Sequence, residues 1–407
     1  MTSTRPTEAE SPLDVLLDLW RSLREAGPVP YDEAQGQCRV VDHQGVSAVL
    51  ADPGAYSSDL TPITPAQQDV ETFRQGDLVG MDPPEHRTLR TLVSQAFTPG
   101  VVQGLEPRIE AVCARLLDGV ADRDRFDLVD TLARPLPIGV IAELLGIPAD
   151  DHGLFQEWAA ALFCGGRLGG SLDMADMADM ADLERALEAI APAVREMNGY
   201  VLDHIRHRRA HPGDDLTSRL LTAEVDGARP ADEEIVGFVA LLLVAGHITT
   251  VLLGNAVVTF DRHSGTLVAL RGNPGRLPDA VEEVPRRLPP SPEPGRRTTR
   301  PVVFGGHEIP ADTLLMVHPG AANRDPSRFN DPDVFDVARS PNPHLTFGHG
   351  IRFCFGAPLV RLEARSALHM LMERFPTLAV PSCDDITYQN PAVSVGVRHL
   401  PIVVTRP

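Results

Sequence analysis

The chain has 407 residues, of which 37 are basic and 56 acidic, and its formal net charge is −19 at pH 7 with histidine neutral. This negative charge argues against nucleic acid and against an anionic membrane surface as partners. Every basic residue is arginine, because the sequence contains no lysine. Mechanisms that need a lysine amine, such as Schiff-base catalysis and phosphate binding by a P-loop, are therefore excluded.

Hydrophobic residues make up 43% of the chain and charged residues 23%, which is typical of a globular protein with a large core. No linker-like stretch divides the sequence, so we expect one domain over residues 1–407. The five cysteines stand far apart without a C-x-x-C pair, and the N-terminus has no apolar signal segment. Both features favour a cytoplasmic location.

Helical spacing and helix-breaking residues dominate the first two thirds of the chain. Helices are predicted at Ser11–Ala26, Gly45–Ala51, Leu105–Val120, Ile138–Leu145, Asp151–Phe163, Leu183–Arg208, Leu216–Glu224 and Asp232–Phe260. A further helix is predicted to open at Pro83-Pro84 and to run through Arg90 to Phe97. Strands are predicted at Cys38–Val41, Pro301–Ile309 and Leu314–His318, and a last helix at Pro358–Phe375, followed by short strands. The expected fold class is mainly α with a smaller β portion.

The longest apolar stretch, Phe238–Val258, is about as long as a membrane span. It contains Gly246, His247 and Asn255, and no basic anchors flank it. We therefore expect a helix through the middle of a soluble core, with no membrane contact.

Residues 173–182 repeat the triplet Asp-Met-Ala, a period that matches no single helix face. The repeat is interpreted as an insert in a solvated loop. A mobile lid, with Met174, Met177 and Met180 offering adaptable apolar contacts, is the alternative.

Three glycines surround Cys354 in the segment F-G-H-G-I-R-F-C-F-G, residues 347–356, just before a predicted helix. Glycines allow tight turns, and helix-start amides with a nearby arginine favour a thiolate. The residues leave three interpretations open: an inert buried cysteine, a nucleophile with His349 as its base, and a thiolate that ligates a metal.

This segment resembles the haem-binding loop F-G-x-G-x-[HR]-x-C-x-G of the cytochrome P450 family. The resemblance implies the P450 fold, with a long central helix over a haem b group and O2 as co-substrate. Cys354 would be the thiolate ligand of the iron, Phe347 would pack beside the sulfur, and Gly356 would belong to the same loop.

The segment A-G-H-I-T-T, residues 245–250, resembles the family's oxygen-binding groove. The resemblance implies that Ala245, Gly246, His247, Thr249 and Thr250 form this groove, with Thr249 steering protons to bound dioxygen. A buried threonine in a helix otherwise bonds to its own backbone carbonyls. Ile248 stands where the family usually has an acid, so the usual acid–alcohol pair lacks its acid.

Two further motifs follow the family's order. Glu283 and Arg286 resemble E-x-x-R, which with Arg339 is expected to form a buried ionic cluster, and Pro285 is expected to distort this helix locally. His86 and Arg90 resemble H-x-x-x-R. The resemblance implies that these two residues, with Arg297 and Arg352, contact the haem propionates.

Details of the sequence resemble bacterial hydroxylases of polyketide antibiotics, macrolide hydroxylases of erythromycin biosynthesis in particular. The resemblance implies a monomeric monooxygenase that takes electrons from a separate ferredoxin and ferredoxin reductase, with Arg352, Arg361 and Arg365 as a basic patch for the ferredoxin. Alternatives are a haem-thiolate peroxygenase or isomerase, a non-catalytic haem-binding protein and a cysteine hydrolase. The expected substrate walls are Asp59–Gly80, Phe163–Asp182, Leu243–Thr250, Pro292–Arg296 and Val393–Val397.

Overall fold

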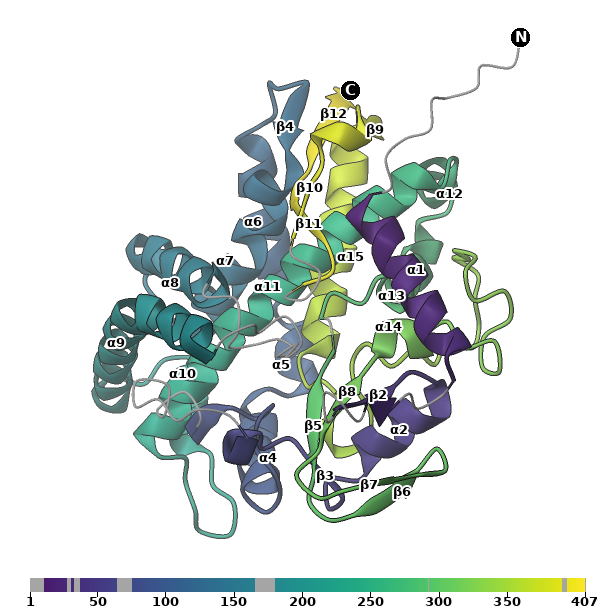
Figure 1. Cartoon of the computed structure of the whole chain (residues 1–407). Helices are drawn as coiled ribbons and strands as arrows, with labels where there is room; N and C mark the ends of the chain where they lie inside the picture. Colours follow the sequence, from purple (N-terminus) through teal and green to yellow (C-terminus); the bar gives the residue numbers. More distant parts are fainter. Residues whose placement is uncertain are drawn as a thin grey trace.

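A computed structural model describes residues 11–27, 31–32, 37–63, 75–164, 180–291, 293–389 and 394–406. The Asp-Met-Ala repeat falls almost wholly outside these ranges. So do residues 64–74, 165–179, 292 and 393 of the predicted substrate walls. Figure 1 shows helices filling most of the molecule, with small sheets at its edges.

Each predicted helix is observed, with ends within three residues of the predicted ones. Further helices, among them Pro99–Gln103 and Thr266–Gly272, were not predicted. The α-helices are α1 (Pro12–Glu25), α2 (His43–Ala51), α4 (Glu85–Ala96), α5 (Pro99–Gln103), α6 (Glu106–Asp118), α7 (Pro135–Leu145), α8 (His152–Cys164), α9 (Met180–Ala210), α10 (Leu216–Thr222), α11 (Asp232–Arg262), α12 (Thr266–Gly272), α13 (Leu277–Arg287), α14 (Pro319–Ala322) and α15 (Ala357–Arg374). A short π-helix at Val129–Ala133 precedes α7.

The strands are two to five residues long and form four separate sheets. They are β1 (Tyr31–Asp32), β2 (Gln37–Val40), β3 (Tyr56–Ser57), β4 (Arg125–Asp127), β5 (Gly295–Thr298), β6 (Val302–Phe304), β7 (His307–Ile309), β8 (Leu314–Val317), β9 (Thr377–Ala379), β10 (Thr387–Tyr388), β11 (Val397–His399) and β12 (Pro401–Thr405). The largest sheet has the order β1-β2-β8-β5-β3, with β2 and β8 parallel and its other pairs antiparallel. Strands β4, β12 and β9 form a second sheet, and β6-β7 and β10-β11 are two-stranded.

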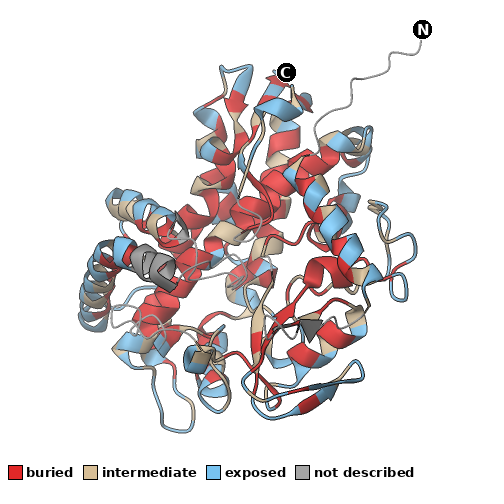
Figure 2. Cartoon of the chain, in the orientation of Figure 1, coloured by how far each residue is buried: buried red, intermediate tan, exposed pale blue. Residues whose placement is uncertain are grey.

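Helix α11 is the central element of the fold. It contacts α7, α8, α9, α13 and α15, and Figure 1 shows it crossing the molecule diagonally. It is long and apolar enough to cross a membrane, yet 83% of its most apolar window is buried inside the protein. Figure 2 shows the buried residues concentrated along this helix and its neighbours, as expected for the core helix that the sequence predicts.

A buried ionic cluster joins α13 to the segment that follows α14. Both side chains of the Glu283–Arg286 pair are 0% exposed, and Arg286 donates to the two Glu283 oxygens at 2.7 and 2.8 Å. Arg339 donates to Glu283 Oε1 at 3.2 Å. The predicted cluster is therefore confirmed. Helix α13 continues through Pro285 to Arg287 without interruption.

The cluster also fixes the backbone that leads toward Cys354. Arg286 donates to the carbonyl oxygen of Asn323 at 2.8 Å. The side-chain amide of Asn323 donates to Thr346 Oγ1 at 2.9 Å, and its Oδ1 accepts from the Leu345 N–H at 2.7 Å. Thr346 in turn donates to the Pro285 carbonyl at 2.7 Å. The residues directly before Phe347 are thus held by Pro285 of α13 and by Asn323 at the end of α14.

Replacing Arg286 by methionine is expected to lower the free energy of unfolding by about 3–5 kcal/mol, because the substitution leaves a buried carboxylate with only one of its two arginine partners. Urea denaturation followed by circular dichroism measures this. The control is Arg276→Met, which removes a 3.7 Å pair with Asp279 on the protein surface and is expected to change stability by less than about 1 kcal/mol. Equal losses in the two variants would contradict the stabilising role of the cluster.

Candidate functional site

The loop before α15 turns Cys354 back toward the segment that precedes it. Gly348 and Gly350 have φ angles of 75° and 65°, in the left-handed region that favours glycine. The Cys354 N–H donates to the Phe347 carbonyl at 2.7 Å. The sulfur therefore lies directly before the first turn of α15, as the sequence predicts.

Two backbone amides point at the Cys354 sulfur, those of Gly356 and Ala357. Burial raises the pKa of the Cys354 thiol, while these amides and the charges of Arg90 and Arg361 act in the opposite direction. The sequence predicts a lowered pKa, and the structure corrects this because burial has the largest effect. A thiolate at this point needs a nearby cation to balance it, which suits a metal ligand better than a free thiolate.

Aromatic and cationic side chains surround the loop. Phe347 is buried, and the Arg361 guanidinium lies 4.3 Å from the centre of its ring. The ring of Phe355 contacts those of Phe97 and Phe238, which ties the loop to α4 and α11. His349, the base that a nucleophilic cysteine would need, is exposed. No hydrogen bond between His349 and Cys354 is found among the described residues.

One short stretch of α11 is uncovered in an otherwise buried helix. Between Ile235 and Phe260 only Ala245, His247 and Ile248 are not buried. Ala245 and Ile248 are three residues apart and so share a face. This face is apolar and uncovered, in the segment where the sequence predicts a groove.

Gly246 does not lie on that face. A Cβ atom added to it would come within 2.8 Å of Ile141 Cδ1 on α7. The expectation that Gly246 opens the groove is wrong. Its missing side chain allows α11 to pack closely against α7, and Ala245 is the small residue that is left uncovered.

The polar residues of the same segment have separate surroundings. His247 is within 3.1 Å of Gln389 Nε2, and burial lowers its pKa to about 3, so it is neutral at pH 7. Thr249 is 1% exposed and is hydrogen-bonded to Glu363 of α15. The buried hydroxyl of Thr250 has no partner among the described residues.

A buried cationic pocket lies at the start of α4. Both ring nitrogens of His86 are buried without a hydrogen-bond partner. Burial, together with the charges of Arg352 and Arg90, lowers the pKa of His86 to about 4. Arg352 donates to the Asp82 carboxylate, and its own Nε is buried and unpartnered. Arg90 donates to the Phe353 carbonyl, beside Cys354.

Arg297, the fourth residue predicted for this pocket, is bonded elsewhere, and the adjacent Arg296 has the unpartnered buried nitrogen instead. Arg297 donates to the Asp59 carbonyl at 3.1 Å and to the exposed Asp312 at 2.5 Å. Arg296 is buried with an unpartnered Nε, and burial and the charge of Arg352 lower its pKa to about 10. Successive side chains of a strand point to opposite faces, so an error of one residue in β5 selects the wrong face.

These residues fit a haem group. Unpartnered nitrogen atoms of His86, Arg296 and Arg352 form a buried cationic site suited to the carboxylates of two propionates. Cys354 supplies a sulfur with two amide donors, and the uncovered face of α11 supplies an apolar wall. Cysteine thiolate is a known axial ligand of haem iron.

Two residues of the site are missing from the sequence prediction. The prediction assigned Arg297 to the propionates and not Arg296. Because side chains alternate between the two faces of a strand, only one of these adjacent arginines can face the pocket. Glu363 lies on the apolar face of α15 and is 1% exposed. A lone acid among apolar positions at helical spacing was the available signal.

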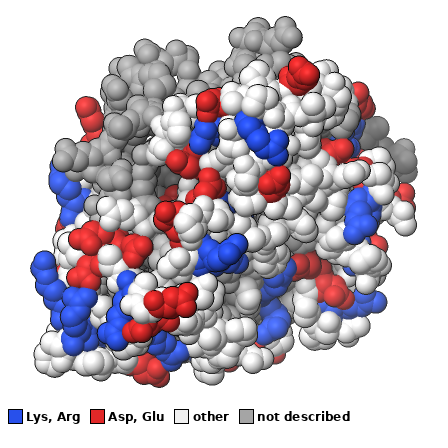
Figure 3. Space-filling model, turned by 90° about the horizontal axis from the view of Figure 1, so that it is seen from below, with Lys and Arg blue, Asp and Glu red and all other residues white. Residues whose placement is uncertain are grey.

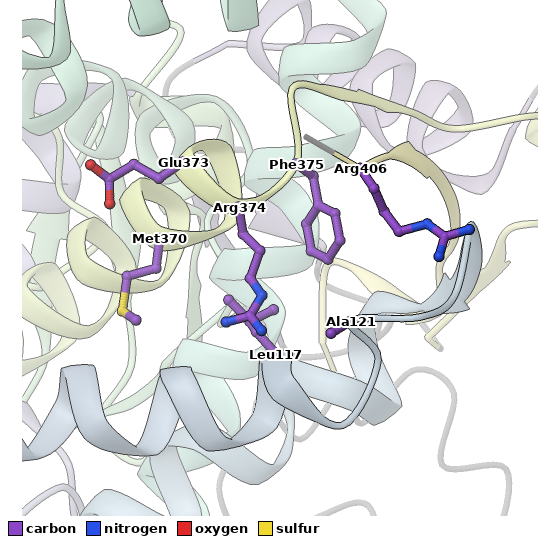
Figure 4. A pocket seen from close by; sticks show the side chains of 7 residues that line it. All are labelled: Leu117, Ala121, Met370, Glu373, Arg374, Phe375 and Arg406. Atoms are coloured by element: carbon purple, nitrogen blue, oxygen red, sulfur yellow. The ribbon is translucent and has the colours of Figure 1, made fainter.

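Two other places in the structure lie away from this site. A hollow between α6 and the end of α15, shown in Figure 4, is lined by Leu117, Ala121, Met370, Glu373, Arg374, Phe375 and Arg406. Met370 is about 20 Å along the helix axis from the first residue of α15, so this hollow is not the cysteine site. Asp127, Asp130 and His399 could hold a metal ion by distance. Asp130, however, already pairs with Arg134 at 2.6 Å.

Comparison with known proteins gives a consistent picture. The Cytochrome P450 family model matches residues 277–405. Erythromycin C-12 hydroxylase of Saccharopolyspora erythraea is 42% identical over 95% of this chain and 94% of its own length. Cyclomarin C epoxidase CymV of Salinispora arenicola is 40% identical over 94% of both chains. The solved structure of open cytochrome P450 EryK from S. erythraea matches with a TM-score of 0.86 and 41% identity, covering 99% of this chain and 98% of that one.

Replacing Arg296 by leucine is expected to speed the loss of haem roughly 10-fold or more, because a charge-assisted hydrogen bond to a buried carboxylate is lost. Transfer of haem to apomyoglobin, followed by absorbance, measures the rate. The matched control is Arg297→Leu on the opposite face of β5, expected to change the rate by less than about twofold. A larger effect at Arg297 than at Arg296 would reverse the assignment.

Proposed function

The chain belongs to the cytochrome P450 family and is a monooxygenase, and we propose that it inserts one oxygen atom from O2 into an unactivated C–H bond of a bulky polyketide. Hydroxylation is the expected outcome, with epoxidation or further oxidation as variants of the same chemistry. We also propose that residues 1–407 act as one domain, since the largest apolar core joins residues between Leu78 and Val404.

One observation carries this proposal. The Cys354 sulfur accepts hydrogen bonds from two backbone amides at the start of α15. His86, Arg296 and Arg352 form a separate buried pocket with unpartnered nitrogen atoms. The pocket of His86, Arg296 and Arg352 would bind the propionates of haem b, and the Cys354 sulfur would bind its iron. When bound, haem supplies the activation of O2 that no side chain can provide.

The residues of the chain have separate tasks in this proposal. Cys354 binds the iron, and the amides of Gly356 and Ala357 stabilise negative charge on its sulfur. Phe347 and Arg361 cover the cysteine loop. Ala245 and Ile248 provide the apolar wall against which the substrate lies, and the Thr249 hydroxyl moves a proton.

The substrate class follows from the wall and from the relatives. Two of the three uncovered residues in this stretch of α11, Ala245 and Ile248, are apolar, and the third, His247, is neutral at pH 7, so the stretch suits an apolar substrate skeleton. The names of two relatives specify erythromycin and cyclomarin C, and 6-deoxyerythronolide B hydroxylase is 38% identical over 82% of this chain. A macrolide or related polyketide is the class that we propose for this protein.

Electrons are proposed to come from a ferredoxin and its reductase, with the enzyme acting as a cytoplasmic monomer. The arginines expected to form a free basic patch are instead paired with acids. Arg361 donates to Glu282 at 2.5 and 2.7 Å, Arg365 to Glu106 at 2.9 Å, and Arg352 to Asp82. Figure 3 likewise shows acidic and basic side chains next to each other on the lower face. Docking of a ferredoxin would therefore depend on a mixed surface.

The absorption spectrum of the reduced, carbon-monoxide-bound protein tests the ligand. Wild type is expected to show the red-shifted Soret band of a thiolate-bound haem. Cys354→Ser is expected to lose this band, because the sulfur donor is gone. The control, Cys383→Ser, changes an exposed cysteine and should keep the band. A thiolate spectrum that survives in Cys354→Ser would refute the assignment.

Turnover assays separate the proposed reaction from its alternatives. Supplied with ferredoxin, reductase and NADPH, the enzyme is expected to convert a macrolide into a product one oxygen atom heavier. Conversion with hydrogen peroxide alone, and none with the redox proteins, would indicate a peroxygenase. Haem binding without any conversion across a macrolide panel would indicate a non-catalytic haem protein.

A further inference from the structure

Three buried nitrogen atoms between α1 and α14 have no hydrogen-bond partner among the described residues. They are Nε1 of Trp20 and Nη1 of Arg24, both on α1, and Nη2 of Arg324, two residues after the end of α14. Trp20 is 2% exposed and Arg324 is 1% exposed. All three atoms are N–H donors that cannot accept a hydrogen bond, so each needs an acceptor from elsewhere.

The packing of α1 against α14 brings these donors together. Helix α1 contacts α14, and Figure 1 shows the two helices near each other. Trp20 and Arg24 are four residues apart and therefore share one face of α1. The guanidinium carbon of Arg324 lies 5.1 Å from the centre of the Trp20 ring. A Cβ atom added to Gly320 of α14 would lie 2.2 Å from Cζ2 of Trp20, so the indole is packed tightly against this helix.

The acids beside these donors do not balance the arginines. Asp333 Oδ1 lies 3.3 Å from Arg324 Nε, and the Asp333 side chain is 55% exposed. The charge of the same aspartate also acts on Arg24 and Arg287. Asp325 acts on Arg24 as well, but both of its carboxylate oxygens already accept backbone N–H groups. Three guanidinium groups thus share one exposed carboxylate and a second one that is already hydrogen-bonded.

The excess positive charge is felt most strongly at Arg324. Burial, together with the charges of Arg287 and Arg286, lowers the pKa of Arg324 to about 9. Its Nη1 donates to the Gly320 carbonyl at 3.2 Å, which leaves Nη2 as the unpartnered end of the group. A buried cation in this position is stabilised by a negative charge placed at that end.

An anion supplies both the missing acceptor and the missing charge. A buried water molecule accepts at most two hydrogen bonds and brings two donors of its own, which need acceptors in turn. An anion accepts from all three N–H groups, and such charge-assisted hydrogen bonds are the stronger kind. Because the donors come from tightly packed side chains, a single-atom anion suits this place better than a tetrahedral one.

We propose that Trp20, Arg24 and Arg324 form a halide-binding site between α1 and the segment after α14, with chloride as the ligand. The site shares no residue with the haem site, and the inference does not depend on the proposed oxygen chemistry. Its effect is on stability, since a ligand that binds only the folded protein stabilises it increasingly as the ligand concentration rises.

The first test is urea denaturation of the haem-loaded protein at constant ionic strength, with sodium chloride exchanged for sodium gluconate, whose anion is too large for the site. The unfolding equilibrium constant of wild type is expected to be roughly 10-fold lower in chloride at a concentration about 10 times the dissociation constant. Trp20→Phe keeps an aromatic ring but removes the N–H, and should lose most of this dependence. The matched control is Trp158→Phe, at a buried indole whose Nε1 is bonded to Glu196 at 3.3 Å, and it should keep the dependence.

Three results of this experiment would overturn the proposal. They are no chloride dependence in wild type, equal dependence in Trp20→Phe and Trp158→Phe, and stabilisation by phosphate but not by chloride. Arg324→Met is expected to abolish the dependence, because the charge is lost together with the donor. If Arg324→Met does not fold, Trp20→Phe still decides.

A direct test is diffraction from crystals of the haem-loaded protein in which bromide replaces chloride, since bromide gives an anomalous signal. A peak within hydrogen-bond distance of Trp20 Nε1 and Arg324 Nη2 is expected. Absence of a peak at these atoms would overturn the proposal. A peak that needs molar bromide, in a protein whose stability does not respond to chloride, would indicate an adventitious ion only and would equally overturn it.

Discussion

The position of the Cys354 sulfur is the constraint on which the rest of the site depends. Its neighbours on both sides fix it: the Cys354 N–H bonds back to Phe347, and the Gly356 and Ala357 amides point at the sulfur. Backbone groups are used for both tasks, so the geometry survives changes of side chain. A sulfur placed in this way has little freedom to move, and an iron bound to it would have one well-defined position relative to α11 and the cationic pocket.

The site buries polar groups without a protein partner of opposite charge in two places, one basic and one acidic. At His86, Arg296 and Arg352 the protein buries nitrogen atoms that lack hydrogen-bond partners, two of them on arginines, an arrangement that an anionic ligand makes favourable. At Glu363 it buries an acid without a cation, and that group is kept neutral instead. The first arrangement binds a charged group. The second provides a hydrogen-bond donor in an apolar environment.

Much of this structure could be predicted from the sequence, because the helices are long, strongly periodic and bounded by proline, glycine or capping residues. The short strands β1, β3, β4 and β5 were not predicted, and β9 to β12 were expected only as short strands after the last helix, since two to five residues carry little pattern of their own and are defined by pairing. Within the site, motif likeness located Cys354, Thr249 and His86. It could not show which way a side chain points, and for this reason Gly246 and Arg297 were given the wrong surroundings and Glu363 was missed.

The network that runs from Glu283 through Arg286, Asn323 and Thr346 to the residues before Phe347 has a consequence for how the protein fails. The anchor of the cysteine loop lies far from it in the chain, in a buried cluster of charges. Damage to that cluster would loosen the loop while most helices remain packed around α11. The colour of the haem-loaded protein would then fade before its helical content falls, and pigment loss would serve as an early report on a distant part of the core.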